Sequence, residues 1–166
     1  MSDLSNLEQR VQALEDKLDI VQLIMSYPLA LDSGADGYCR SVWAKEGVFD
    51  RGSSEPAEHS GGYQGSYGVK TIVEEMNGPA MRAARDKGLA HLMTAPHVQV
   101  NGDQAIATNY NQLIEHGADG FITTRVSANR WELVKRNERW LIERRTLRLL
   151  DGSSEARQLL GHDLKE

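Results

Sequence analysis

Residues 91–114 read HLMTAPHVQVNGDQAIATNYNQLI, and this stretch decides the fold of the chain. Apolar and polar residues alternate on both sides of Asn101-Gly102-Asp103, which is the period of a strand with one buried face. The Asn-Gly-Asp segment has the composition of a tight hairpin turn. The sequence therefore predicts two antiparallel strands, over residues 91–100 and 104–114.

The same period of two continues toward the C-terminus. Two further strands are predicted over residues 121–135 and 139–149, with turn-forming segments at 117–120 and 135–138. The chain before residue 91 has helical periodicity instead. Helices followed by a run of antiparallel strands predict an α+β domain with the helices on one face of the sheet.

A long helix is predicted at the N-terminus, where Ser5-Asn-Leu-Glu8 forms a capping box. Its apolar residues recur at alternating spacings of three and four and form one stripe: Leu4, Leu7, Val11, Leu14, Leu18, Val21 and Met25. We expect this stripe to pack on the sheet, and an intermolecular coiled coil is the alternative. Pro28 should kink the helix, and Asp32-Ser33-Gly34 should end it.

Shorter elements fill the region between this helix and the sheet. A second helix is predicted over residues 37–44 and a third over 69–87, which Gly78-Pro79 could break. Residues 51–67 are rich in Gly and Ser and should be mostly loop, and a loop of this length is usually functional or mobile. We expect residues 1–150 to form a single domain, followed by a polar tail over 151–166.

The composition limits the classes of partner. The chain has 166 residues, of which 40% are apolar and 26% charged, as in ordinary soluble globular domains. Its net charge of −5, without a basic cluster, disfavours nucleic acid and anionic membranes as partners. Cys39 is the only cysteine, which excludes an intrachain disulfide and a thiolate metal cage. Because no secretory signal or membrane-spanning run is visible, we expect a cytoplasmic protein.

Four segments resemble the SnoaL-like branch of the nuclear transport factor 2-like superfamily. They are the helix end Tyr27-Pro-Leu-Ala-Leu-Asp32-Ser-Gly with residues 41–49, the segment 65–72, the start of the sheet at 91–105, and the closing hairpin at 131–145. Together they cover about residues 7–150. This resemblance implies a cone-shaped, cystatin-like roll, in which long N-terminal helices pack on a curved, mostly antiparallel sheet that encloses a pocket.

The resemblance also implies a reactive pair. Asp32 and His91 are placed similarly to a pair in gamma-hexachlorocyclohexane dehydrochlorinase, scytalone dehydratase and bile acid 7-alpha-dehydratase, where an aspartate that ends the long helix partners a histidine that opens the first long strand. Tyr27 and Trp43 resemble pocket residues of these enzymes. Without the resemblance, Asp32 would be interpreted as an ordinary residue that ends a helix, and His91 as an ordinary histidine in a strand. His97 has the same strand parity as His91, so both could face the pocket.

An Asp–His pair in an apolar pocket suits proton abstraction. The carboxylate holds one ring nitrogen and stabilises the imidazolium that forms when the other nitrogen takes a proton. A leaving group β to that proton makes the reaction an elimination, and reprotonation at a conjugated position makes it an isomerisation. We therefore expect a lyase or isomerase that acts on a hydrophobic cyclic or aromatic small molecule, without a metal or cofactor.

Strand alternation predicts further pocket residues. Met93 shares a face with His91, and the next strand presents Asn109, Asn111 and Leu113 on one face. We expect these four residues to contact the substrate together with Tyr27 and Trp43, although the asparagines could equally lie on the surface. Arg144 and Arg145 have opposite parity, so at most one faces inward, where it could anchor an acidic substrate group.

Two other functions fit the same fold. One is a non-catalytic domain for small-molecule binding or assembly, and the other is the small subunit of an aromatic-ring dioxygenase. Many relatives assemble as dimers or trimers through the outer face of the sheet. The resemblance therefore implies a homo-oligomer, and the sequence does not choose between the two states.

Overall fold

The computed structural model describes residues 3–52, 65–162 and 164. The chain forms, in order, α1 (Asp3–Ser33), α2 (Asp36–Ser41), β1 (Trp43–Asp50), β2 (Ser66–Gly68), α3 (Val69–Met76), α4 (Pro79–Lys87), β3 (Leu89–Met93), β4 (His97–Asn101), β5 (Gln104–Gly117), β6 (Gly120–Arg136), β7 (Arg139–Leu149) and α5 (Ser154–Gly161). The expected α+β class, with helices packed on a mostly antiparallel open sheet, is confirmed.

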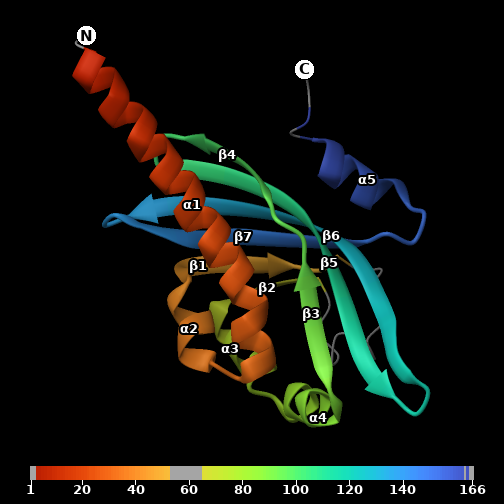
Figure 1. Ribbon diagram of the computed structural model, residues 1–166. Coiled ribbons are helices and arrows are strands. Elements are labelled where there is room, and N and C mark those ends of the chain that lie inside the picture. The colour runs from red at the N-terminus through yellow and green to blue at the C-terminus, as the bar shows by residue number, and fades with distance from the viewer. Residues whose placement is uncertain (1–2, 53–64, 163, 165–166) are drawn as a thin grey trace.

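One curved sheet organises the molecule. Its strand order is β2-β1-β7-β6-β5-β3, and β4 pairs separately with β5. Only the β1–β7 pair is parallel among the described strands. Figure 1 shows α1 crossing one face of the sheet, with α2 beside its C-terminal half, and α3 packs against α2 and β1. The short α5 packs against β6 and β7, and its Ala156 is fully buried.

The inward faces of β5 and β6 form the floor of the core. The face of β5 that was predicted to point inward is buried, and so are the residues of β6 that pair with it. The pairs are Ala105 with Leu133, Ala107 with Trp131, Asn109 with Asn129, Asn111 with Ser127, and Leu113 with Arg125. One half of this floor is therefore apolar and the other half polar. The aromatic and aliphatic side chains of α1 cover the apolar half.

The first predicted strand is two strands, which corrects the expectation for His97. Thr94-Ala95-Pro96 separates β3 from β4, because proline has no N–H to donate to a strand ladder. The interruption shifts the alternation by one residue. His91 stays buried on the inner face, whereas Val98 and Val100 take that face in β4 and His97 is exposed. His97 therefore does not face the pocket.

The second predicted helix is too long. The helix ends at Ser41, and Trp43 begins β1, which pairs with β7. The pairing starts with the backbone N–H of Ile142, which donates to the carbonyl of Val42 at 2.7 Å. The extended backbone is stabilised by this ladder and by burial of Trp43, and tertiary pairing of this kind overrides a short helical pattern.

Two other expectations have mixed outcomes. The break in the third helix is confirmed, since α3 ends at Met76 and Pro79 occupies the first turn of α4. Of the predicted loop, residues 53–64 lie outside the described residues. At its end, Ser66–Gly68 pairs with β1 as the short strand β2, so the loop prediction is wrong there.

The predicted stripe of α1 is not the face that packs on the sheet. The buried face consists of other residues: Ile20, Leu23, Ile24, Tyr27, Ala30 and Leu31. Leu4, Leu7, Val11, Leu14 and Leu18 are instead between 45% and 67% exposed. Side chains two residues apart on a helix point about 200° apart, so Leu18 and Ile20 lie on nearly opposite sides. The long helix therefore has two apolar faces, and only one of them is covered.

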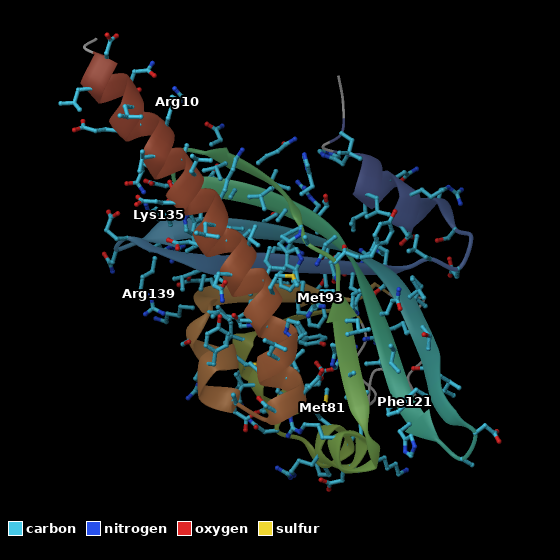
Figure 2. The ribbon with its side chains drawn as sticks, in the orientation of Figure 1. Arg10, Met81, Met93, Phe121, Lys135 and Arg139 are labelled. Atoms are coloured by element: carbon cyan, nitrogen blue, oxygen red, sulfur yellow. The ribbon has the colours of Figure 1, made fainter. Side chains whose placement is uncertain are left out.

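Asp16 is where α1 first meets the sheet. Its Oδ1 accepts hydrogen bonds from Lys135 Nζ at 2.9 Å and from Trp140 Nε1 at 3.0 Å. Burial alone would raise the pKa of Asp16, but these two hydrogen bonds outweigh it and lower the pKa. Before Asp16 the helix runs past the sheet, and Figure 2 shows Arg10 on this projecting part and Lys135 beside the middle of α1. Within the described ranges, no helix is both long enough and apolar enough to cross a membrane.

The two faces of α1 predict opposite responses to truncation. Ile24→Ala should lower the free energy of unfolding by about 2–5 kcal/mol, because Ile24 is fully buried and the change leaves a cavity. The matched control Leu29→Ala changes a side chain that is 70% exposed on the same helix and should shift it by no more than about 0.5 kcal/mol. Urea denaturation followed by circular dichroism measures both, and equal losses would contradict this assignment of the buried face.

Candidate active site

The end of α1 and the middle of β3 meet through Asp32 and His91. Asp32 Oδ1 lies 2.6 Å from Nδ1 of the His91 ring, and Asp32 Oδ2 accepts the backbone N–H of the same residue at 2.7 Å. One carboxylate therefore holds both the backbone and the ring of His91. The two residues are 59 positions apart, and the packing of α1 on β3 brings them together.

This contact determines the chemistry of the imidazole. Because the Nδ1 proton is donated to Asp32, a neutral ring carries its free lone pair on Nε2. The side chain of His91 is only 7% exposed. Burial lowers the pKa of His91, and the hydrogen bond and charge of Asp32 oppose this shift without cancelling it. The ring is therefore neutral at pH 7, in the state that a general base requires.

His91 lines a cavity between the helices and the sheet. The cavity is small: its volume is about 20 Å³, which is room for about one water molecule. Its polar lining, besides His91, consists of Tyr27, Glu75 and three arginines, which are Arg51, Arg125 and Arg145. Apolar side chains from α1, β1, α3, α4 and β7 complete the walls: Leu31, Phe49, Met76, Met81 and Leu147. The cavity is therefore lined by both apolar and charged side chains.

A buried network closes one side of this cavity. Arg51 forms an ion pair with Glu75, and both residues are almost fully buried. Arg51 Nε also donates to the Tyr67 hydroxyl at 2.6 Å, and that hydroxyl donates to Glu75 Oε2 at 2.6 Å. Burial is the largest cause of the raised pKa of Tyr67, so it stays protonated as the donor. The network joins the residue after β1 to β2 and α3.

Arg145 is the most deeply buried of the three arginines, at 3% exposed. Its Nε donates to Asn129 Oδ1 at 3.1 Å, and the guanidinium carbon lies 4.5–5.2 Å from the ring centroids of Trp131, Phe49 and Tyr27. In the described part of the chain, no carboxylate lies within ion-pair distance of Arg145. Burial lowers the pKa of Arg145 to about 10, so the group is still cationic at pH 7.

The hydroxyl of Tyr27 is a second unused polar group in the cavity. Tyr27 is fully buried, and its hydroxyl makes no hydrogen bond of good geometry to a described residue, although the donors Trp43 and Arg145 lie beside it, so its O–H proton stays unused. Burial raises the pKa of Tyr27, which keeps the hydroxyl protonated and able to donate. A buried donor without a partner is costly, and a ligand in the cavity would relieve that cost.

The other predicted contact residues lie around this cavity rather than along its lining. Trp43, Met93, Asn109, Asn111 and Leu113 are all buried, but none of them lines it. Asn109 accepts a hydrogen bond from Trp131 Nε1 at 3.0 Å and donates to the carbonyl of Thr94 at 3.0 Å, so its polar groups are used within the fold. The proposed role of these five residues in substrate binding stays a prediction.

Several cavity residues were not predicted from the sequence. Glu75 had a usable signal, because it shares a helical face with Ile72 and Met76, and a carboxylate among apolar residues marks a buried charge. Arg51 lay in a stretch that was expected to be loop, and no pattern distinguished it. For the last strand, the parity argument was correct: Arg145 faces inward, and the side chain of Arg144 is 40% exposed.

Comparisons with known proteins agree with this architecture. A family model described as a SnoaL-like domain matches residues 12–146. The chain belongs to this SnoaL-like family. A nuclear transport factor 2-like protein with a cystatin-like fold from Novosphingobium aromaticivorans is 33% identical, with a TM-score of 0.85 over 96% of this chain and 98% of that one. This similarity confirms the predicted superfamily and its cystatin-like fold.

More distant solved structures share the fold alone. The hexachlorocyclohexane dehydrochlorinase LinA-type3 from Novosphingobium barchaimii is 17% identical, with a TM-score of 0.62 over 90% of this chain and 91% of that one. A protein of unknown function from Nostoc punctiforme has the same identity, 17%, and the same TM-score, 0.62, over 82% of this chain and 92% of that one. No curated protein matches the chain significantly.

The lowered pKa of His91 predicts a pH-dependent stability. Below the ordinary histidine pKa of 6.5 the unfolded chain binds a proton that the folded site resists, so stability falls as the pH drops. Between about pH 7.5 and pH 5.5 the wild type should lose up to about 1 kcal/mol more unfolding free energy than His91→Asn. The asparagine keeps a donor near the position of Nδ1 but does not titrate. Urea denaturation at both pH values measures the difference, and parallel losses would contradict the buried, neutral ring.

Proposed function

We propose that this protein is a cofactor-free lyase of the dehydratase or dehydrohalogenase type, or an isomerase, that removes a proton from carbon in a hydrophobic cyclic or aromatic molecule. The observation that carries the proposal is the double hydrogen bond from Asp32 to His91 beside a cavity. It leaves Nε2 as the only ring nitrogen free to accept a proton. The dehydrochlorinase among the structural relatives supports a reaction of this class on this fold.

The proposed reaction begins with transfer of a C–H proton to Nε2 of His91. The ring becomes an imidazolium, and the adjacent Asp32 carboxylate stabilises its charge. In an elimination, the electron pair of the broken C–H bond forms a C=C bond as the leaving group departs with its own pair. In an isomerisation, the pair moves into a conjugated carbonyl, and the imidazolium returns the proton to another carbon. A positioned base supplies about 10²–10⁴-fold of rate.

The opposite charge develops on the substrate, and two cavity residues are suited to stabilise it. Tyr27 offers an unused O–H, and Arg145 offers a positive charge whose nearest described neighbours are aromatic rings and an amide. Both groups are buried, where electrostatic stabilisation is stronger than in water. They would hold a substrate oxygen or a departing anion. The hydrophobic body of the substrate would lie against the apolar walls after the cavity widens, because its volume in this conformation is only about 20 Å³.

We also propose that the protein forms a homo-oligomer, either a dimer or a trimer. The support is a set of apolar side chains on the outer face of the sheet that are at least 40% exposed: Leu92, Tyr110, Phe121 and Val126. They come from neighbouring strands β3, β5 and β6. Exposed apolar groups that gather on one sheet face are typical of protein interfaces.

A substrate screen with a matched pair of variants tests the proposed chemistry. Cyclic alcohols, ketones and halides are incubated with the protein in D₂O, and NMR follows product formation and deuterium uptake at carbon. His91→Asn removes the proton-accepting nitrogen and should lower turnover by about 100-fold or more. His97→Asn changes an exposed histidine on β4 and should leave turnover unchanged.

The alternatives produce different results in the same screen. A non-catalytic binding or assembly domain would take up ligands without converting them, and His91→Asn would change affinity only. The small subunit of an aromatic-ring dioxygenase would purify with a larger catalytic subunit. Equal turnover by the wild type and His91→Asn would contradict the proposed role of His91.

Tyr27→Phe separates a role in the reaction from a role in the fold. The variant removes one hydroxyl that has no hydrogen-bond partner among the described residues, so the free energy of unfolding should stay within about 1 kcal/mol of the wild type. Turnover of any substrate that carries an oxygen at the reacting centre should fall by about tenfold or more. Thermal denaturation and steady-state kinetics measure the two effects. Loss of stability without loss of turnover would contradict the assignment.

A further inference from the structure

The part of α1 that extends beyond the sheet carries a stripe of exposed apolar residues. The helix from Asp3 to Glu15 contains no buried residue, and Asp16 is the first one to be held by the sheet. This segment is about 20 Å long at 1.5 Å per residue. The extension continues a helix that the folded body already nucleates, so it can stay helical by itself, but its apolar stripe remains in contact with water.

The stripe has the spacing of a coiled-coil seam. It consists of Leu4, Leu7, Val11, Leu14 and Leu18, at alternating intervals of three and four, which places them at positions a, d, a, d and a of successive heptads. All five side chains are at least 45% exposed. Asp16 lies at position f, diametrically opposite this seam, and is the residue that binds the sheet. The seam therefore faces directly away from the body of the protein.

We infer that the α1 helices of two copies of this chain pair through this seam, in parallel and in register. The apolar residues of the seam are spaced alternately three and four positions apart, which is the spacing of side chains that pack knobs-into-holes between two helices. Because the seam points away from the sheet, the two bodies would lie on opposite outer sides of the helix pair. This interface is separate from the cavity and from the exposed apolar residues of β3, β5 and β6.

Charge complementarity selects the second copy and its direction. Arg10 lies at position g and Glu15 at the e position of the next heptad, which are the two positions that face each other across a parallel pair. A parallel dimer therefore contains two Arg10–Glu15 ion pairs. An antiparallel dimer that pairs Val11 with Leu14 would place Glu8 near Glu15 and Arg10 near Lys17, which are like charges. In the antiparallel register that pairs Leu7 with Val11, Glu8 meets Glu8 and Arg10 meets Arg10, and the one opposite pair, Asp3 with Lys17, involves the first turn of the helix. The only like-charged pair of the parallel arrangement, Asp3 with Glu8, lies at the first turn, where helices fray.

Sedimentation of a seam variant and a matched control tests the interface. Leu7→Glu/Leu14→Glu places charges in the seam and should raise the dissociation constant by about 100-fold or more, since each tenfold step corresponds to 1.4 kcal/mol. Asn6→Glu/Ala13→Glu adds the same charges at exposed positions outside the seam and should leave the constant within about threefold of the wild type. Because none of these four side chains is buried, both variants should keep the circular dichroism and melting temperature of the folded body.

Three outcomes would overturn the inference. One is a wild type that stays a single chain at every concentration. Another is an assembly that Leu7→Glu/Leu14→Glu does not weaken, which would assign it to the sheet face alone. The third concerns ion pairing. Arg10→Glu should weaken the dimer, and adding Glu15→Arg in the same chain should restore it. If the double variant dissociates as readily as Arg10→Glu, the parallel arrangement is contradicted.

A cysteine variant tests the direction of the pair directly. In a parallel, in-register dimer the two Leu14 side chains meet across the seam, so Leu14→Cys should form a disulfide-linked dimer under mild oxidation. The native Cys39 is buried, and burial raises its pKa to about 11, which keeps it unreactive. Lys17→Cys lies outside the seam and serves as the control. Cross-linking of Lys17→Cys as fast as Leu14→Cys would contradict the seam.

Discussion

The two hydrogen bonds between the Asp32 carboxylate and His91 connect the long helix α1 to the sheet. Asp32 accepts both the ring N–H and the backbone N–H of His91, and so joins the end of a 31-residue helix to the strand at the edge of the main sheet path. A single hydrogen bond would leave either the ring or the strand free to shift. With both in place, the orientation of the imidazole follows from the position of the backbone. The proposed base is thus positioned by the same contact that docks the helix.

The polar groups buried in the cavity beside this pair lower the stability of the fold. The cavity holds Arg145 among aromatic rings, the Arg51–Glu75 ion pair, and a Tyr27 hydroxyl without a described partner. Apolar side chains of similar volume would stabilise a core at least as well as buried charges of this kind. Buried donors and cations line the same cavity as His91, and the proposed reaction would use them to stabilise negative charge on the substrate. The polar half of the β5–β6 floor contributes, because Asn129 orients Arg145.

Strand positions were predictable from the sequence wherever one local period decided them. Alternation over residues 104–149 located β5, β6 and β7 and their inward faces, because a half-buried strand imposes a period of two on its own residues. Prediction failed where distant segments decide the backbone. Trp43 is extended because β7 offers it a ladder, and His97 points outward because Pro96 interrupts a pattern that otherwise looks continuous. Arg51 and Glu75 become cavity residues only when β1 and α3 meet.

The amino-acid sequence by itself determined that this chain has a long helix with a 3–4 apolar stripe, a family resemblance to SnoaL-like proteins, and an aspartate and a histidine at the positions where such proteins carry a reactive pair. Tertiary structure alone decided which side of that helix is covered. The Asp16 contacts to Lys135 and Trp140 turn Ile20 and Ile24 toward the sheet and leave Leu7 and Leu14 in solvent. The spacing of apolar residues in the sequence shows that a helical face is apolar. Whether that face is covered depends on residues of the sheet that lie more than a hundred positions away in the chain.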